Sequence, residues 1–367
     1  MSEGKTGRIL ALGALAVFLT GGAATAQDKV VNVYNWSDYI AEEVLAQFEA
    51  ETGIKVVYDT FDSNEIVETK LLAGGTGYDV VVPSAEFLSR QIKAGVFQPL
   101  DKSKLTNIGN MWDVVSTRVA KYDPDNAYSV NYMWGTTGLG YNEEKVTALL
   151  PDAPVNSWAL LFDPANAKVL AECGIHVLDA PAEAIPAALA YLGLDPDSRD
   201  PADLEKAEAV YKAIRPYIQK FHSSEYINGL ANGDICLALG WSGDIFQARD
   251  RADEANNGVT VVYSVPKEGA QMWFDQLAIP ADAPHPDNAH TFINFLMRPD
   301  VIAQASNYVY YANGNKASQE LLDEEVIGDP AIYPDQETLD RLFTKLPYDA
   351  RTQRTVNRIW TAVKTGQ

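Results

Sequence analysis

The apolar positions of the chain follow two periods in alternation. Short runs of β-branched and aromatic residues predict buried strands, and stretches with apolar positions three and four residues apart predict helices. From residue 30 to residue 94 the two patterns take turns: the predicted strands are 30–34, 54–61 and 78–83, and the predicted helices are 41–51, 64–73 and 85–94. Such alternation predicts a parallel sheet with helices on both faces.

A second stretch of alternating patterns begins after residue 132. Its predicted strands are 138–141, 235–240, 259–265 and 273–280, and its predicted helices are 184–192 and 201–221. The later helix 286–296 is similar in pattern to the helices of the first stretch. We therefore expect the chain to leave a first lobe near residue 132, build a second lobe, and return near residue 265. Two such crossings form a hinge.

The predicted lobes account for most of the chain. Residues 27–132 and 266–310 form lobe one, and residues 133–265 and 311–345 form lobe two. Residues 346–367 contain the amphipathic pattern of a helix, which we expect to pack on the body. With 367 residues, of which 47% are hydrophobic, the chain is long enough to fill two cores.

Residues 1–26 are predicted to form a secretory signal peptide. Lys5 and Arg8 precede the apolar stretch 9–19, and Ala24-Thr25-Ala26 has the small-x-small pattern of a cleavage site. The apolar stretch is too short to span a bilayer. We therefore expect a soluble, periplasmic protein that begins near Gln27.

The charge of the chain narrows the class of partner. Its 29 basic and 50 acidic residues give a formal net charge of −21. A protein this acidic repels nucleic acid and anionic lipid and attracts cations through its long-range field. Solubility alone is the competing explanation for the charge.

Cysteines and histidines carry separate predictions. Cys173 and Cys236 are the two cysteines of the sequence, and in an oxidising compartment such a pair predicts one disulfide. Two separately buried thiols are the alternative. The four histidines lack metal-ligand spacing, and the sequence contains no nucleophile-elbow motif in a strand-turn-helix setting, so we expect no metal site, no cofactor and no catalytic residue.

Aromatic and acidic side chains recur near the ends of predicted strands. Ligands of open parallel sheets bind beyond the carboxyl ends of the strands. Three segments pair a tryptophan with an aspartate two or three residues away: Trp36 with Asp38, Trp241 with Asp244, and Trp273 with Asp275. Aromatic rings offer walls and cation–π faces, and carboxylates accept charge-assisted hydrogen bonds from ammonium groups. The pattern predicts a site for an organic cation.

Each of these residues also has an explanation without a ligand. Ser37 or Asp38 could cap the helix that follows. Trp241 and Trp273 could be ordinary core aromatics. The pair Tyr310-Tyr311 resembles the tyrosine pair of ferric-ion carriers, although its acidic and aromatic company favours an organic ligand.

Seven segments closely resemble the putrescine/spermidine-binding proteins of polyamine ABC transporters. They are YNWSDY (34–39), FDSNE (61–65), VVPS (81–84), FHSS (221–224), ANGDIC (231–236), GWSGD (240–244) and YAN (311–313). The likeness extends over essentially the whole mature chain. It implies a type II periplasmic-binding-protein fold of the α/β class, with two lobes, each a mostly parallel sheet flanked by helices, joined by a two-strand hinge.

The resemblance also implies roles for individual residues. By position, the ammonium contacts are Asp38, Asp244, Asp275 and Glu183, the polar partners are Ser37 and Ser84, and the aromatic walls are Trp36, Trp241, Trp273 and Tyr311, with Tyr39 nearby. These residues come from both lobes. A ligand that touches both lobes stabilises the closed form by its differential affinity.

Specificity within the family depends on a few positions. The chain resembles the putrescine type, because spermidine binders tend to carry another acid near Ala180. Three residues depart from that type: Trp273 replaces a phenylalanine, Glu86 a small residue, and Lys345 an apolar one. The added acid could hold a further amine, and the added base could exclude one or pair with Glu86.

The resemblance implies a function without chemistry. We expect a monomer that captures putrescine in the periplasm and delivers it to an inner-membrane ABC permease, with spermidine, agmatine or cadaverine as alternative ligands. Two other hypotheses are a carrier for a sugar, ferric ion or amino acid, and a glycoside hydrolase that uses two of the carboxylates.

Overall fold

The computed structural model describes residues 29–366 together with Met1 and Gly4. Apart from those two residues, the predicted signal peptide over 1–26 lies outside the described residues. Among the helices that the structure describes, none combines the length and the apolarity needed to cross a bilayer.

The first parallel unit follows the predicted alternation. Its strands are β1 (Val30–Trp36), β2 (Lys55–Phe61) and β3 (Val80–Val81), and its helices are α1 (Glu42–Thr52), α2 (Asn64–Ala73) and α3 (Ala85–Lys93). Strand β1 lies between β2 and β3 and is parallel to both. Gly53 ends α1 in the left-handed conformation at φ 67°, which glycine adopts without a Cβ penalty.

A second parallel unit has β5 (Ile175–Val177) between β6 (Lys220–Phe221) and β7 (Leu237–Trp241). Its helices are α8 (Pro181–Tyr191), α9 (Pro201–Ile214), α10 (Glu225–Ala231) and α11 (Ser242–Ala255). The helix predicted over 201–221 was too long. The α-helix ends at Ile214 because Pro216 lacks an N–H and clashes with the preceding turn, so the chain continues through a short 3-10 turn into β6.

Two long strands join the parallel units. Strands β4 (Ser129–Asn142) and β9 (Ala270–Ala278) pair with each other antiparallel, β9 pairs with β3, and β4 pairs with β7. The strand order is β2-β1-β3-β9-β4-β7-β5-β6, so the sheet is mixed at its centre. Only 138–141 of β4 was predicted, because all 14 of its residues are buried and the strand shows no alternation of apolar and polar positions.

The remaining short strands pair with β4 or β9. Strands β8 (Val261–Ser264) and β10 (Ala312–Asn313) pair with β4, and β11 (Leu342–Phe343) pairs with β9. The two segments predicted as strands 259–265 and 273–280 therefore do not pair with each other. Each lies against its own stretch of β4.

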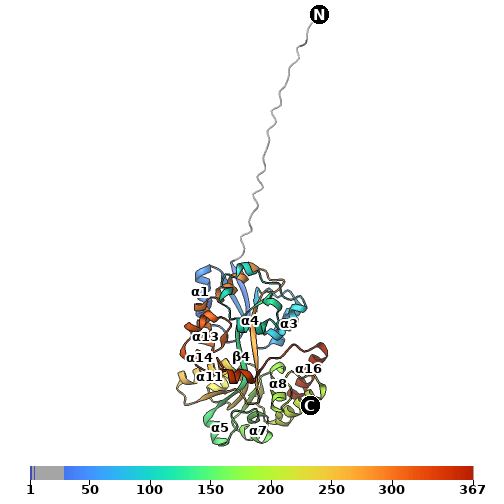
Figure 1. The fold of residues 1–367 in the computed structure, drawn as a ribbon, viewed down its shortest axis with the longest axis vertical. Coiled ribbons are helices and arrows are strands. Elements are labelled where there is room, and N and C mark those ends of the chain that lie inside the picture. The colour runs from blue at the N-terminus through green and yellow to red at the C-terminus, as the bar shows by residue number, and fades with distance from the viewer. Residues whose placement is uncertain (2–3, 5–28, 367) are drawn as a thin grey trace.

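The hydrophobic residues form two cores. The first core takes its residues from 31–133 and 273–311. The second core takes its residues mainly from 134–272 and 312–363. Figure 1 shows the same division along the long axis, with α1, α3 and α13 (Pro299–Val309) at one end and α5 (Glu143–Leu149), α7 (Pro164–Leu170) and α8 at the other. Strands β4 and β9 contribute residues to both cores.

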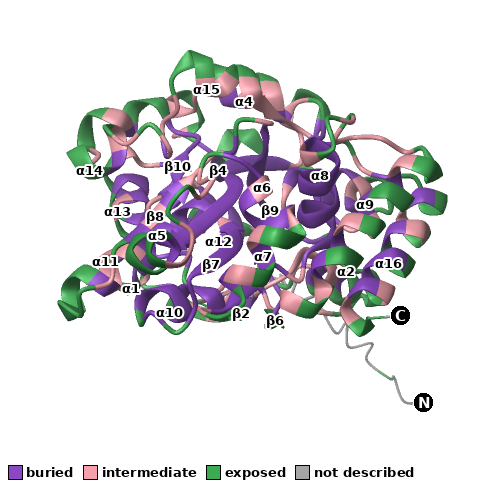
Figure 2. Cartoon of the chain, turned by 90° about the horizontal axis from the view of Figure 1, so that it is seen from below, coloured by how far each residue is buried: buried purple, intermediate pink, exposed green. Residues whose placement is uncertain are grey.

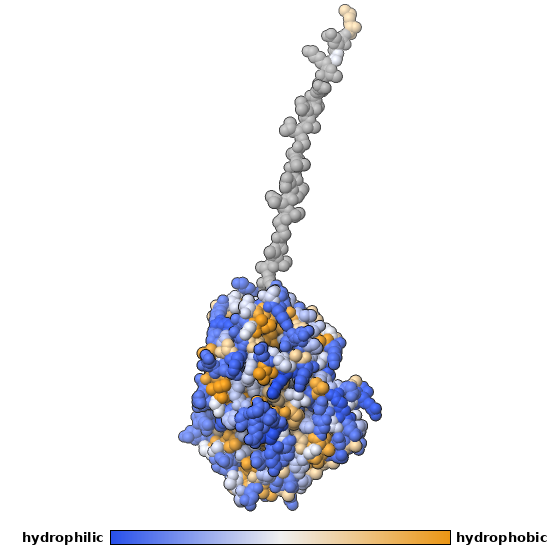
Figure 3. All heavy atoms as spheres, in the orientation of Figure 1, coloured by the Kyte–Doolittle hydropathy of each residue, from blue (hydrophilic) through white to orange (hydrophobic). Residues whose placement is uncertain are grey.

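Helices cover the sheet and turn their polar faces outward. In Figure 2 the buried residues concentrate on the strands and on α8, while the outer faces of α7 and α9 are exposed. The face shown in Figure 3 is mostly hydrophilic, with apolar residues in separate groups. Helix α12 (Pro286–Leu296), which has the predicted bounds, packs in the first core. The periodicity did not predict α5, α7, α10, α11 or α13. It also did not predict α4 (Asp113–Val119), α6 (Ala159–Phe162), α14 (Glu324–Ile327) and α15 (Gln336–Arg341).

The C-terminal helix and the disulfide both stabilise the second core. Helix α16 (Ala350–Thr365) packs against α9 and α8 through Val356, Ile359 and Trp360. Cys173 and Cys236 form the predicted disulfide, with Cα atoms 5.4 Å apart. It ties the chain after α7 to the beginning of β7, which decides against two separate thiols.

Candidate functional site

A pocket with about 480 Å³ of empty space lies where the two cores meet. Ten of the eleven predicted ligand contacts line it: Trp36, Ser37, Tyr39, Ser84, Glu183, Trp241, Asp244, Trp273, Asp275 and Tyr311. Among the described residues that line the pocket, none is Lys, Arg or His. The acids of the pocket therefore have no basic neighbour in its wall.

Asp275 is held in the pocket by two hydroxyl groups. The Tyr39 hydroxyl donates to Asp275 Oδ2 at 2.8 Å, and the Ser84 hydroxyl donates to Oδ1 at 2.6 Å. Asp275 comes from the middle of β9, and Ser84 precedes the first turn of α3. Burial raises the pKa of Asp275 to about 7, against the lowering effect of the two hydrogen bonds.

Asp244 is held in the same manner by two tyrosines, one from each core. It lies in the first turn of α11 and accepts from the Tyr226 hydroxyl at 2.6 Å and from the Tyr311 hydroxyl at 2.8 Å. A Cβ at Gly243 would lie 2.4 Å from the Tyr311 ring, so glycine is required for this close approach. Burial raises the pKa of Asp244 to about 6.

Glu183 is the third buried acid of the pocket. It lies in the first turn of α8 and accepts hydrogen bonds from Thr137 Oγ1 at 2.5 Å and Gln271 Nε2 at 3.1 Å. Burial raises its pKa to about 8, and the negative charge of Asp275 is among the smaller raising effects. Three acids with raised pKa values in one pocket favour a cationic ligand, because a cation would stabilise their ionised forms.

Aromatic rings from separate segments meet across the pocket. Trp36 and Trp241 lie with ring centroids 5.5 Å apart and planes 73° apart, and Trp273 and Tyr311 lie 5.2 Å and 65° apart. The Trp36 Nε1 group donates to the Val82 carbonyl at 2.9 Å, which fixes that ring. The rings give the pocket apolar walls between its acids.

The tyrosine pair divides between two places. Tyr311 lines the pocket, whereas the Tyr310 hydroxyl donates to Asp250 at 3.1 Å beside a different hollow of the surface. The two phenols therefore do not converge as a pair of ligands for one ion. Among the described residues, no group of three or more His, Cys, Asp or Glu side chains is arranged to hold a metal.

Asp38 is the predicted contact that does not line the pocket. Its carboxylate lies 2.9 Å from Arg251 Nη2 on α11, and its side chain is 41% exposed. The capping alternative is wrong for both candidates, because α1 begins at Glu42 after Ala41 without any side-chain cap. The Ser37 hydroxyl instead donates to the Phe61 carbonyl at 3.2 Å. Asp38 as a ligand contact stays a prediction.

Residues 43–334 match the family of bacterial extracellular solute-binding proteins. The chain belongs to this family. It is 52% identical over 365 residues to the Putrescine-binding periplasmic protein SpuD of Pseudomonas aeruginosa, covering 99% of each chain, and 52% identical over 360 residues to the Putrescine-binding periplasmic protein PotF of Escherichia coli, covering 98% of this chain and 97% of that protein.

Solved structures support the same assignment for this solute-binding protein. The spermidine/putrescine ABC transporter substrate-binding protein PotD of Streptococcus pneumoniae superposes with a TM-score of 0.73 at 32% identity, over 92% of this chain and 99% of that chain. The predicted α/β fold of the type II periplasmic-binding-protein class is confirmed. The exact lobe boundaries stay a prediction.

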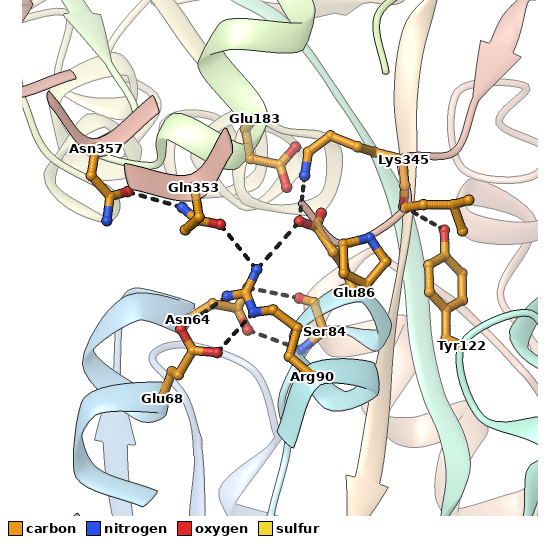
Figure 4. A network of polar contacts seen from close by, with 12 residues as sticks. Asn64, Glu68, Ser84, Glu86, Arg90, Tyr122, Glu183, Lys345, Gln353 and Asn357 are labelled. Atoms are coloured by element: carbon orange, nitrogen blue, oxygen red, sulfur yellow. Dashed lines mark hydrogen bonds and ion pairs between the residues drawn. The ribbon is translucent and has the colours of Figure 1, made fainter. Parts of the chain in front are cut away.

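The predicted specificity residues of this solute-binding protein lie outside the main pocket. Ala180 is buried and precedes α8. Glu86 and Lys345 form a buried ion pair, and Figure 4 shows this pair with its polar neighbours. Both residues line a second, adjoining pocket. The pairing of the added base with the added acid, one of the two alternatives from the sequence, is the arrangement seen.

Six lining residues were not predicted as contacts: Phe61, Asp62, Asn64, Ser223, Ser224 and Ile227. Five of them follow or end β2 and β6, so the rule that ligands bind beyond strand ends would have found them. Asn64 Nδ2 donates to Ser84 Oγ at 3.0 Å and thereby orients the hydroxyl that holds Asp275. The role of Tyr226, whose hydroxyl donates to Asp244, could not be predicted from any pattern in the sequence.

Proposed function

We propose that the protein is the periplasmic binding component of a polyamine ABC importer. It captures putrescine or a close polyamine between two lobes and delivers it to an inner-membrane permease, without catalysing a reaction. In this proposal the protein works as a monomer, is exported by the signal peptide over 1–26, and has no nucleic acid partner.

The observation that carries the proposal is the set of three buried acids in one aromatic pocket whose described lining contains no Lys, Arg or His. Asp275, Asp244 and Glu183 each accept hydrogen bonds from the protein and each have a raised pKa. Buried carboxylates without counter-ions destabilise a protein, and a bound dication would supply the missing charge. The tryptophan and tyrosine rings suit the methylene chain between two ammonium groups. The relatives named above support putrescine as the ligand.

The two cores are proposed to be the lobes. The chain passes between them within β4, within β9, and between Tyr311 and Ala312. Asp275 and Ser84 approach the pocket from one side, and Asp244 and Glu183 approach it from the segments that build the second core. A ligand that binds both sides favours the closed arrangement, which a permease can distinguish from the open one.

Calorimetric titration of putrescine tests the proposal. The protein is first unfolded and refolded to remove ligand carried from the cell. We expect one putrescine to bind per chain, and we expect Asp244→Ala and Asp275→Ala to abolish the heat. No heat with putrescine, cadaverine, agmatine or spermidine would end the proposal. If the protein instead gives binding heat with a sugar or an amino acid, and putrescine does not compete with that binding, the physiological ligand is another solute.

A further inference from the structure

A second pocket extends the ligand site. It has about 320 Å³ of empty space and shares Asn64, Ser84, Glu183 and Trp273 with the first pocket. Beyond these shared residues its wall includes Glu86 and Lys345. The two pockets therefore adjoin at Ser84 and Glu183, and the second offers space to a ligand longer than the first pocket.

Lys345 brings a fixed positive charge into the second pocket. Its side chain is fully buried, and its ammonium group is hydrogen-bonded to Glu86, 259 residues away in the sequence. The ammonium also lies 3.9 Å from the centre of the Tyr348 ring, and the Tyr122 hydroxyl donates to the Lys345 carbonyl at 2.9 Å. The backbone and the charged end of Lys345 are therefore both held in place.

Glu86 depends on Lys345 as its main partner. Arg90 Nη1 lies 3.8 Å from Glu86, but Arg90 is engaged by Glu68 at 2.9 and 3.0 Å and by Gln353 at 3.1 Å. Figure 4 shows these groups around Glu86, with Glu183 beside the Lys345 ammonium. Glu86 and Lys345 both act on the pKa of Glu183, so the pair lies within electrostatic range of the ligand site.

We propose that the Lys345 ammonium occupies the place that the third ammonium of a triamine would need, so that the protein selects diamines over triamines. This inference rests on the proposed function. A diamine ends within the first pocket and does not meet Lys345. A triamine such as spermidine would bring a third positive charge against a buried one, while the acid that could receive it is already paired.

Replacement of the lysine by an apolar side chain of similar length separates this role from a structural one. Lys345→Met removes the buried positive charge and leaves Glu86 without its main partner. We expect the unmodified protein to bind putrescine at least about tenfold more tightly than spermidine, and Lys345→Met to reduce that ratio by at least about tenfold. The measurement is calorimetric titration of both ligands.

Two further variants complete the experiment. The double variant Glu86→Gln/Lys345→Met removes both charges, and we expect it to gain less spermidine affinity than Lys345→Met alone because no acid remains for the third ammonium. Lys104→Met removes an exposed lysine that pairs with Asp287 and lines neither pocket, so the ratio should not change.

The outcomes separate the inference from the proposed function. An unchanged ratio in folded Lys345→Met, or equal affinity of the unmodified protein for both amines, would overturn the inference and leave the proposed function intact. If Lys345→Met does not fold, the double variant is compared with the unmodified protein, and an unchanged ratio in the double variant would overturn the inference. If the unmodified protein binds no polyamine, the proposed function fails, and the inference fails with it.

Discussion

At the scale of single residues, the pocket combines charge with burial. Asp275 and Asp244 are 4% and 7% exposed, and each is oriented by two hydroxyl donors. These donors fix the position of the carboxylates without neutralising them. Each ionised carboxylate therefore has no counter-ion in the pocket wall, and a bound ammonium group would supply one.

Asp275→Asn should weaken putrescine binding by about 100-fold, because loss of one member of a buried charge pair costs about 2–5 kcal/mol. The same substitution should leave the stability of the ligand-free protein equal or slightly higher, because it removes a buried charge that has no counter-ion in the pocket wall. Calorimetry and urea unfolding measure the two effects. A large loss of stability without ligand would contradict this account of Asp275.

Asp38→Asn distinguishes an ion pair from a ligand contact. The structure places the Asp38 carboxylate on Arg251, outside the lining of the pocket. If that pair is its role, the affinity for putrescine should fall by less than about threefold, because exposed ion pairs contribute about 1 kcal/mol or less. A loss as large as that of Asp275→Asn would support the ligand contact that the family resemblance implies.

Binding should depend on pH through the three acids. Their pKa values lie at about 6, 7 and 8, whereas primary amines stay protonated over this range. The dication binds ionised carboxylates, so affinity should rise between about pH 5 and pH 8, and binding should release protons. Titrations in buffers of different ionisation enthalpy measure the released protons. An affinity that does not change with pH would contradict the raised pKa values.

The same raised pKa values make the ligand-free protein less stable as the pH rises, whereas they make ligand binding tighter. A carboxyl whose pKa is higher in the folded state stabilises the fold below its unfolded pKa, and that contribution is lost as the pH rises through the folded value. The three acids therefore favour the ligand-free fold at about pH 5 over pH 8, and bound putrescine should reverse this preference.

At the scale of elements, the ends of strands and the first turns of helices carry the site. Asp244 and Glu183 lie in the first turns of α11 and α8, and Ser84 immediately precedes α3. Helix beginnings favour negative charge, because their free N–H groups point outward. This placement helps to keep carboxylates ionised in the presence of a ligand.

The disulfide is the covalent link between two elements of the second core. Cys173 and Cys236 close a loop with a sequence separation of 63. Replacement of both cysteines by alanine should lower the free energy of unfolding by about 4 kcal/mol, which is the chain-entropy estimate for such a loop. Urea unfolding of the double variant measures the change. Since neither cysteine lines the ligand pocket, the affinity for putrescine should stay the same.

At the scale of the whole molecule, the proposed closure around the ligand should change both the stability and the dimensions of the protein. Putrescine at about 100 times its dissociation constant should stabilise the protein by about 2.7 kcal/mol. It should also reduce the radius of gyration measured by small-angle X-ray scattering, if binding shifts an open population to the closed one. A radius that does not change with ligand would contradict the hinge.

The sequence by itself determined the local elements of the first parallel unit and predicted the kind of ligand. Alternating periods located the β1–α3 unit, because its strands are short apolar runs and its helices have apolar positions three and four residues apart. Tryptophans and aspartates near strand ends indicated an organic cation. Two cysteines in a chain with a predicted signal peptide indicated a disulfide between them.

Only the tertiary structure decided which of these side chains share a cavity. The length of β4 could not be predicted, because all of its residues are buried and it has no alternation of apolar and polar positions. Its antiparallel pairing with β9 makes the sheet mixed. Asp38 forms an ion pair with Arg251, 213 residues away in the sequence, and Lys345 forms one with Glu86, 259 residues away. Local patterns fix which face a residue takes, whereas partners this distant in sequence are chosen by how the two cores pack together.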